Sequence, residues 1–288
     1  MESLKGIDLA VENGQIFGFV GPNGAGKSTT IKILTGLLKP TGGAAWLNDK
    51  PVRDPASRKS VGYLPENPNF YGYLSLFDLL SLVARIRGMD KQAGKARIDE
   101  LITLVGLQDT GKRHVKTFSK GMVQRAGIAI ALLGDPRLII LDEPMSGLDP
   151  LGRDLVAKIF RNLQDAGKTI FFSTHIIPDI EALCDSVGIL VEGELRYVGS
   201  VQDMLYSRGE KLEMTFSLPG IKLDAIPFQG RPHLMWQKEK IYKLEVEEKG
   251  ISEDIRLIVA SGGNIIKIEQ RRKSFEALFK ELTSSGPN

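Results

Sequence analysis

The chain has 288 residues, of which 38 are Lys or Arg and 35 are Asp or Glu, and it contains one cysteine. This length suggests one large domain with a smaller one, and a net charge of +3 gives no general reason to expect a nucleic acid or an acidic membrane as partner. A single cysteine excludes an internal disulfide, and no apolar stretch approaches the roughly 20 residues that a membrane-spanning helix needs. Because the first residues also lack the pattern of a secretory signal, we expect a reducing compartment and a membrane role only through a partner.

The start of the chain predicts a β-hairpin followed by a helix. Apolar residues alternate over 7–11, Asn13-Gly14 is a strong two-residue turn signal, and the apolar run 16–20 follows. Residues 28–38 then have the pattern of a helix, which Lys39-Pro40 closes.

The middle of the chain predicts a helical region and then a parallel sheet. Residues 70–125 carry apolar side chains at helical spacing. Two short apolar runs at 137–144 and 168–175 are separated by the amphipathic segment 151–166. This order of strand, helix and strand is typical of parallel β-structure with buried strands.

The residues after about 206 predict a small α/β accessory domain. Short alternating runs such as 211–218 indicate strands, and a helical pattern near 251–260 is followed by a further strand and a last helix. We therefore expect two domains, residues 1–205 and residues 206–288.

The segment from Gly21 to Ser28 matches the pattern G-x-x-x-x-G-K-[ST], placed between an apolar strand and a helix as this motif requires. Glycines there let backbone N–H groups turn toward an anion, and the first amides of the following helix add to the positive concavity. The lysine can reach the β- and γ-phosphates of a nucleotide, and the serine hydroxyl can bind Mg²⁺. The alternative is a tight strand-to-helix turn with an exposed lysine. The predicted nucleotide-binding residues are Gly21, Asn23, Gly24, Ala25, Gly26, Lys27, Ser28 and Thr29.

A pair of carboxylates ends the first of the two later apolar runs. Asp142 is placed to hold Mg²⁺, directly or through water. Glu143 follows where the chain leaves the strand, so it can lie near the γ-phosphate and act as a general base for the attacking water. The alternative is that one of the two carboxylates only caps the next helix.

Three further motifs are interpreted together with this pair of carboxylates. Ser119 and Gly121 precede a helical apolar run, which by itself would indicate an ordinary helix cap. Asp149 lies in the segment SGLDP soon after the carboxylates. His175 ends the second apolar run, at the edge of an open α/β sheet where ligands bind, although a lone histidine is more often structural.

In their order along the chain, the motifs GPNGAGKST, FSKGM, LIILDEP, SGLD and STH resemble those of ATP-binding cassette (ABC) ATPases, the nucleotide-binding subunits of transporters. The resemblance covers about residues 1–205. It implies an α/β fold in which a P-loop NTPase (RecA-like) core carries an antiparallel β subdomain and a helical subdomain at about 70–125, beside the small C-terminal α/β domain.

The resemblance also implies ATP and Mg²⁺ as ligands and a head-to-tail dimer that holds two ATP molecules between its subunits. Lys27, Ser28 and Asp142 would serve the nucleotide bound to their own chain, where Glu143 is the base. His175 would contact the γ-phosphate of that same nucleotide.

Other residues would act across the dimer. Ser119 and Gly121 would meet the γ-phosphate bound to the second copy, and Asp149 would lie at the seam between the two chains. The charge of the triphosphate would thus hold together two surfaces that otherwise have little reason to associate.

The sequence departs from the family pattern at three places. Where the family usually has a glutamine, the segment VGYLPENPNF has Glu66, which could bind a metal-bound water; this variant resembles cassettes that drive export. The signature reads FSKGM in place of LSGGQ, with Ser119 and Gly121 kept. No aromatic residue precedes Phe17, so we expect the chain to begin inside the domain, without its first strand and its adenine-stacking residue. The alternative is that adenine is held in another way, and we predict weakened ATP affinity.

The favoured function is an ATPase subunit of an exporter, peripheral to the cytoplasmic face of the cell membrane. It would pull on a separate membrane-spanning permease through residues 70–110, with no nucleic acid as partner. The alternative is a soluble ABC-type ATPase that acts on nucleic acid or the ribosome, which would need a coiled-coil insertion or a second cassette. A P-loop GTPase or kinase is a third class, disfavoured by the signature motif, the strand-end histidine and the lack of an Asn-Lys-x-Asp sequence.

Overall fold

The computed structural model describes residues 2–205, 211–220, 222–228, 233–247, 249–270 and 274–284. These residues divide into two compact units, one with residues 2–201 and 281–284 and the other with residues 202–280. The sequence places the division after residue 205, and the assignment of the two parts to separate functions stays a prediction. Each unit is described by itself below.

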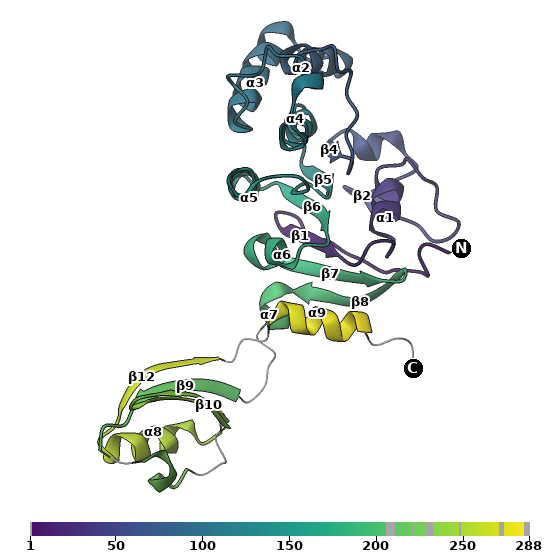
Figure 1. The fold of residues 1–288 in the computed structure, drawn as a ribbon. Coiled ribbons are helices and arrows are strands. Elements are labelled where there is room, and N and C mark those ends of the chain that lie inside the picture. The colour runs from purple at the N-terminus through teal and green to yellow at the C-terminus, as the bar shows by residue number, and fades with distance from the viewer. Residues whose placement is uncertain are drawn as a thin grey trace. The chain divides into compact units, whose positions relative to one another are not determined.

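A six-stranded sheet forms the centre of the first unit, in the order β4-β5-β6-β1-β7-β8 (Figure 1). The first five strands in this order run parallel, and β8 pairs antiparallel with β7 at the edge. In spatial order the strands span Val61–Leu64, Leu138–Asp142, Thr169–Thr174, Ile16–Val20, Ser186–Val191 and Glu194–Ser200. The predicted parallel sheet is confirmed, and β8 is its antiparallel strand. The short strands β2 (Trp46–Leu47) and β3 (Lys50–Pro51) form a separate antiparallel pair.

The middle strands of this sheet are buried on both faces, as apolar parallel strands are expected to be. Every residue of β1 and of β6 is buried. Phe17 of β1 stacks on Phe171 of β6 with ring centroids 5.6 Å apart. The same core cluster includes Ile31 of α1 (Lys27–Leu34). The strands that precede the chemical motifs therefore lie in the buried core of the unit.

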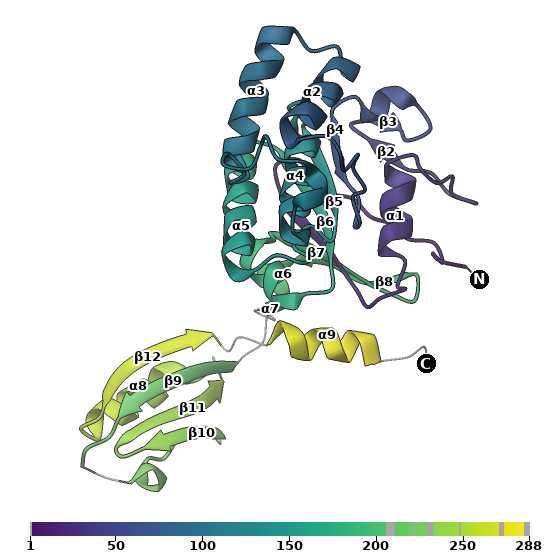
Figure 2. The same ribbon diagram turned by 45° about the horizontal axis from the view of Figure 1, so that its top comes forward.

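Helices cover both faces of the sheet (Figures 1 and 2). Helix α1 lies on one side, and α5 (Pro150–Asp165) and α6 (Ile177–Leu183) lie on the other. Helix α5 packs against β6, and α6 packs against both β1 and β6.

A helical region follows β4 in the sequence. It contains α2 (Leu76–Ile86), α3 (Lys91–Leu104) and α4 (Lys120–Leu132), which contact one another, and α4 packs on β4. Two short 3-10 turns are also present: η1 (Pro55–Arg58) precedes β4, and η2 (Val115–Thr117) lies between α3 and α4. Helical spacing of apolar residues in the sequence predicts this region.

The predicted hairpin at the start of the chain is wrong. Residues 7–11 form no strand, although their side chains do alternate between half-buried and exposed. Both edges of β1 are instead occupied by parallel neighbours, β6 and β7, so no edge remains for an antiparallel partner. The predicted helix over 28–38 is also too long, because α1 ends at Leu34.

The second unit is a four-stranded antiparallel sheet with one helix against it. The sheet order is β10-β11-β9-β12, and the strands span His233–Lys238, Ile241–Glu247, Lys211–Ser217 and Asn264–Gln270. Helix α8 (Ile251–Ala260) contacts β12, and its Ile258 joins a buried cluster that includes Phe216. The sequence predicts this α/β character but gives no sign of β10. The remaining elements are η3 (Leu223–Ala225), α7 (Val201–Leu205) and α9 (Phe275–Ser284).

Among the described residues, no helix combines the length and the apolar character needed to span a bilayer.

Candidate active site

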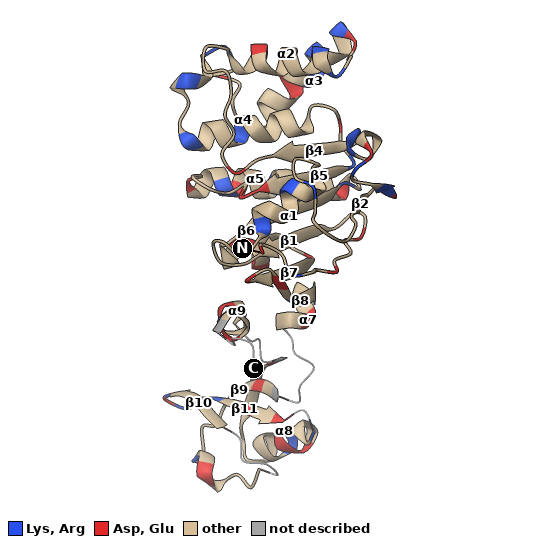
Figure 3. Ribbon diagram, turned by 90° about the vertical axis from the view of Figure 1, so that its right-hand side faces the viewer, with Lys and Arg blue, Asp and Glu red and all other residues tan. Residues whose placement is uncertain are grey.

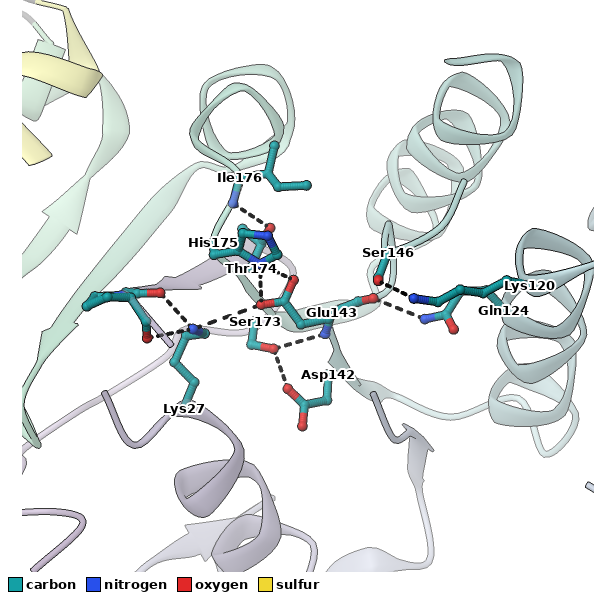
Figure 4. Close-up of polar contacts among 12 residues, drawn as sticks. Lys27, Lys120, Gln124, Asp142, Glu143, Ser146, Ser173, Thr174, His175 and Ile176 are labelled. Carbon is teal, nitrogen blue, oxygen red and sulfur yellow. Dashed lines mark hydrogen bonds and ion pairs between the residues drawn. The ribbon is translucent and has the colours of Figure 1, made fainter. Parts of the chain in front are cut away.

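Three loops leave the carboxyl ends of the neighbouring strands β1, β5 and β6 and meet at one edge of the sheet. They carry the glycine-rich segment 21–26, the carboxylate pair and His175. Ligands of open α/β sheets bind outside the carboxyl ends of the strands. Figure 4 shows the polar side chains of these loops turned toward one another.

The glycine-rich loop has a main chain that other residues could not adopt without strain. Gly24 and Gly26 have φ angles of 81° and 111°, in the left-handed region. A Cβ atom on Gly21 would lie 2.2 Å from the carbonyl oxygen of Leu190. The N-terminus of α1 receives no side-chain hydrogen bond at its cap and has no acidic residue in its first turn. The first amides of α1 are therefore left for an anion, as the sequence predicts.

Lys27 turns its buried side chain back into this loop. Its Nζ donates to the carbonyl oxygens of Gly21 and Pro22, at 2.6 and 3.1 Å. The same atom lies 3.9 Å from Oε1 of Glu143. The lysine thus connects the loop after β1 to the loop after β5.

Burial disfavours the charged form of Lys27, and nearby carboxylates favour it. Burial lowers the pKa of Lys27 from its ordinary value, and the negative charges of Glu143, Asp142 and Glu66, in decreasing order, oppose this shift. A bound polyanion would add to the opposing side and so favour the charged lysine.

The two carboxylates are held by one buried hydroxyl. Ser173 of β6, which is fully buried, donates from Oγ to Oδ1 of Asp142 at 2.6 Å. Its Oγ also accepts from the backbone N–H of Glu143 at 3.0 Å. Glu143 has a φ angle of 51°, which is uncommon for a residue with a side chain and typical of functional sites. The Ser173 hydroxyl therefore holds both the carboxylate of Asp142 and the strained backbone of Glu143.

His175 lies against the carboxylate of Glu143. Its Nδ1 is 3.0 Å from each of the two carboxylate oxygens, while its side chain remains 51% exposed. On the opposite side, Nε2 of Gln124 in α4 donates to the carbonyl oxygen of Glu143 at 3.1 Å. The histidine that the sequence assigns to this edge is thus in contact with the predicted base.

Sequence reasoning missed Ser173 and Gln124. The available signal is weak in both cases: Ser173 is the first polar residue after the apolar run 170–172, and Gln124 stands beside Arg125 in a helix. Their partners come from other elements, so no local pattern identifies them.

Ser119, one of the residues expected to act across a dimer, lies at the start of α4. Ser119 caps α4, its Oγ accepting from the N–H of Met122, and the neighbouring Lys120 donates to Oγ of Ser146 at 3.2 Å. In Figure 4, Lys120 lies on the far side of Glu143 from Lys27. The start of α4 therefore lies on the far side of Glu143 from the phosphate-binding lysine of its own chain.

Gly121 and Asp149 belong to the same surface as Ser119. A Cβ atom on Gly121 would lie 3.1 Å from the carbonyl oxygen of Gly147, so the signature helix packs closely on the SGLDP segment. Asp149 caps α5, its Oδ1 accepting from the N–H of Gly152 at 2.9 Å. Glu66 is exposed and lines a small cleft that Lys120 and Gln124 also line.

These residues fit a nucleoside triphosphate with Mg²⁺. Gly24 has no atom within 4 Å of a Cβ position, so the loop is open on that side. Within the described part of the chain, no group of three or more His, Cys, Asp or Glu could hold a metal by itself. Mg²⁺ characteristically takes one or two protein ligands and completes its shell with phosphate oxygens and water. Asp142 and Ser28 are a donor set of that kind.

Comparison with known proteins assigns the family. The sequence profile described as ABC transporter matches residues 4–146. An ABC transporter ATP-binding protein of Nostoc sp. is 41% identical over 284 residues, which cover 96% of this chain and 82% of that protein. The chain belongs to the ABC transporter ATP-binding proteins.

Two further similarities agree with this membership. The bacitracin transport ATP-binding protein BcrA of Bacillus licheniformis is 36% identical over 303 residues, which cover 99% of this chain and 94% of the relative. A solved structure of the ATP binding subunit of an ABC transporter is 35% identical, with a TM-score of 0.65, and the match covers 70% of this chain and 85% of that one. This ABC protein is accordingly an ATP-binding subunit and an ATPase with a P-loop NTPase core, as its motifs predict.

Proposed function

We propose that this ABC protein is the ATP-hydrolysing motor of an exporter, that it works with Mg²⁺ at the cytoplasmic face of the cell membrane, and that it drives a separate membrane-spanning permease. One observation carries the hydrolytic part of the proposal. The carboxylate of Glu143 lies between the ammonium of Lys27, 3.9 Å away, and Nδ1 of His175, 3.0 Å away.

Each of these side chains has a distinct role in hydrolysis. ATP supplies the phosphoryl group, and Mg²⁺ spreads the negative charge of its phosphates. Lys27 exchanges its contacts with loop carbonyls for phosphate oxygens, and Asp142 and Ser28 hold the metal ion. Glu143 takes a proton from the attacking water, and His175 keeps that carboxylate in place. Glu66 is close enough to influence Lys27 electrostatically, and we assign it a metal-bound water.

The site is completed by a second copy of the chain. Ser119 and Gly121 lie on a surface separate from Lys27, and Ser119 is exposed at the first turn of α4. A helix N-terminus of this kind attracts an anion. In a head-to-tail dimer each copy presents this turn to the nucleotide of the other, with Asp149 at the seam.

The assignment to export depends on the names of similar proteins. The bacitracin transport protein of Bacillus licheniformis matches nearly the whole of this chain, including the second unit. The relatives reported above are named for transport, so an action on nucleic acid or the ribosome has no comparable support. We assign the accessory domain predicted from the sequence, residues 206–288, to a supporting role in the same transporter.

We place the contact with the permease at a basic cleft beside the helical region. The cleft has a volume of about 880 Å³ and lies among η1, the start of α3 and the end of α4. Figure 3 shows basic residues on α3 and near β4. Its charged lining residues are Arg58, Lys59, Arg87, Arg97 and Asp135. This excess of positive charge suits an acidic segment on the cytoplasmic side of a membrane protein.

The proposal is tested first by the change Glu143→Gln. The amide keeps the shape of the side chain but cannot accept the proton, so turnover is expected to fall by at least about 100-fold while ATP still binds. Hydrolysis is measured as Mg²⁺-dependent phosphate release, and assembly by sedimentation with and without ATP, where the variant is expected to accumulate as a dimer.

The matched control is Glu12→Gln, which changes an exposed carboxylate of the same unit. Its turnover is expected to equal that of the unchanged protein. Normal turnover in Glu143→Gln would remove Glu143 as the base, and an ATP-bound monomer would remove the shared seam.

A further inference from the structure

Two helices of the first unit begin at residues of the proposed site. Helix α5 begins at Asp149, whose Oδ1 accepts from the N–H of Gly152 at 2.9 Å. Helix α6 begins directly after His175 and Ile176. The starts of these helices therefore carry one residue assigned to the dimer seam and one that contacts the base.

An ion pair joins the first turns of these two helices. Arg153 of α5 donates its backbone N–H to the carbonyl oxygen of Asp149 at 2.9 Å, one turn away. Its Nη1 lies 3.7 Å from Oδ1 of Asp179 in α6. Asp179 is anchored at the start of α6, where its N–H donates to the carbonyl oxygen of Ile176 at 3.2 Å. The pair thus connects the cap of α5 to the residues next to His175.

This ion pair is poorly suited to stabilise the fold. The side chain of Asp179 is only 11% exposed, and its second oxygen, Oδ2, is buried without a hydrogen-bond partner among the described residues. Burial raises the pKa of Asp179, and the charges of Arg153 and then His175 oppose that shift. Buried ion pairs of this kind often cost as much in desolvation as they return in attraction. A reason other than stability is needed for a carboxylate at this position.

We propose that Arg153 and Asp179 form a positioning link, which ties the helix that starts at the seam to the helix that starts at His175 and so sets where the imidazole lies against Glu143. This inference rests on the proposed function, because it gives the link a task in hydrolysis. A shift of Asp149 at the seam moves the first turn of α5, and the ion pair carries that shift to the first turn of α6. Neither residue touches the nucleotide, so both act through His175.

The chain offers a matched comparison. Nη2 of Arg161, farther along α5, donates at 3.0 Å to the carbonyl oxygen of Ala182 near the end of α6. This second link joins the same two helices with the same type of side chain, but at the ends remote from His175. If the links only pack the two helices together, removing either one should change kcat equally. If the first link positions His175, only its removal should lower kcat.

The test compares Asp179→Asn, Arg153→Gln, their double variant and Arg161→Gln in the full-length protein. We expect Asp179→Asn and Arg153→Gln to lower kcat by about tenfold with little change in KM for ATP, because small misplacement of a catalytic group costs about this much or more. The double variant is expected to lose no more than the single ones, since both remove one link. Arg161→Gln is expected to keep normal kcat and KM.

Two readouts do not depend on turnover. Asp179→Asn removes the buried charge and leaves Arg153, whose side chain is 35% exposed and so is not a buried unpaired charge. This variant is therefore expected to melt at about the same temperature as the unchanged protein, so that slower turnover cannot be attributed to misfolding. The chain has three histidines, and the ring signal of His175 is expected to shift in the NMR spectrum of Asp179→Asn without ATP but not in that of Arg161→Gln.

The outcomes separate this inference from the proposed function. A normal kcat in Asp179→Asn, an equal loss in Arg161→Gln, or an unmoved His175 signal would each overturn the positioning link, even if Glu143→Gln is slow. Normal turnover in Glu143→Gln would overturn the assigned base instead, and the His175 signal would still decide whether the link exists.

Discussion

At the scale of single residues, Ser173 shows how much of the site depends on one hydroxyl. The residue is fully buried, and its Oγ donates to Asp142 and accepts from the N–H of Glu143. Without this hydroxyl, Oδ1 of Asp142 and the backbone N–H of Glu143 would both lose the hydrogen bond that they make to Ser173. Ser173 is therefore a positioning residue for the two carboxylates.

We expect Ser173→Ala to lower the free energy of unfolding by about 1–3 kcal/mol, since each buried polar group left without a hydrogen bond is costly. Turnover is expected to fall as well, because the strained backbone of Glu143 loses its support. Urea denaturation and phosphate release measure the two effects.

Ser57→Ala is the control for that change. Ser57 is as deeply buried, but its Oγ has no hydrogen-bond partner among the described residues. Removing this hydroxyl is expected to leave stability unchanged or slightly raised. Equal losses in the two variants would contradict the special role of Ser173.

The sequence predicts the residues whose chemistry is contained in a short motif. Lys27 and Glu143 lie in local patterns whose residue types already specify a nucleotide and a base, and the structure brings their side chains within 3.9 Å of each other. Ser173 and Gln124 could not be predicted in this way, because their hydrogen bonds join strands and helices that are distant in the sequence. Asp179 escapes prediction for the same reason.

At the scale of elements, hydrophobic spacing predicts which segments are buried but not which strands pair. Residues 7–11 alternate as a strand would, yet they form none, because the neighbours of β1 are decided by the long-range pairing of β6 and β7. The end of α1 depends on a glycine that sequence reasoning overlooked. Gly36 has a φ of 72° two residues after Leu34, which is a common way to end a helix. Every residue of β10 is exposed, so the strand carries no pattern of burial to recognise.

The glycine-rich loop gives a prediction at this scale. In Gly26→Ala the alanine would have to keep a φ of 111°, which is unfavourable for a residue with a side chain. Its Cβ atom would also lie 2.6 Å from the carbonyl oxygen of Ser3, so the loop must move. We expect ATP affinity to fall by about tenfold or more, because losing even one charge-assisted hydrogen bond costs about 1.5–3 kcal/mol and 1.4 kcal/mol is tenfold. Titration with a fluorescent ATP analogue measures the change.

Gly43→Ala is the control that separates the effect of backbone strain from the effect of a place in the phosphate-binding loop. Gly43 also has a left-handed φ, 74°, but it has open space around its Cβ position. This variant is expected to lose some stability and to keep its ATP affinity. If both variants bind ATP equally well, the main chain of the glycine-rich loop is not the phosphate site.

At the scale of the whole molecule, the basic cleft is the surface that we propose for the contact with the permease. Asp135, the acidic residue of its lining, is paired with Lys168, at 2.8 Å. Arg87 and Lys59 make no ion pair with any described residue, so their charges are available to a partner.

We expect the double change Lys59→Glu and Arg87→Glu to release the protein from membranes that contain its permease. Reversing two charges replaces attraction by repulsion at the contact, which raises the rate of dissociation. Flotation of native membranes at low salt, followed by detection of the retained protein, measures this effect.

The control for this pair is Lys112→Glu with Lys116→Glu, which reverses two exposed charges elsewhere in the first unit. Membrane retention is expected to stay normal in that variant. Equal release by both pairs would mean that general surface charge, and not the cleft, holds the protein at the membrane.

The place of β5, β6 and β1 in the sheet order has a mechanical consequence. Each of the three has a hydrogen-bonded neighbour on both sides, so the strand ends that precede Glu143, His175 and the glycine-rich loop are held in the interior of the sheet. The strand next to the helical region, β4, is by contrast an edge strand with a single neighbour. The catalytic side chains are thus attached to strands held from both sides, whereas the helical region adjoins a strand held from one side only.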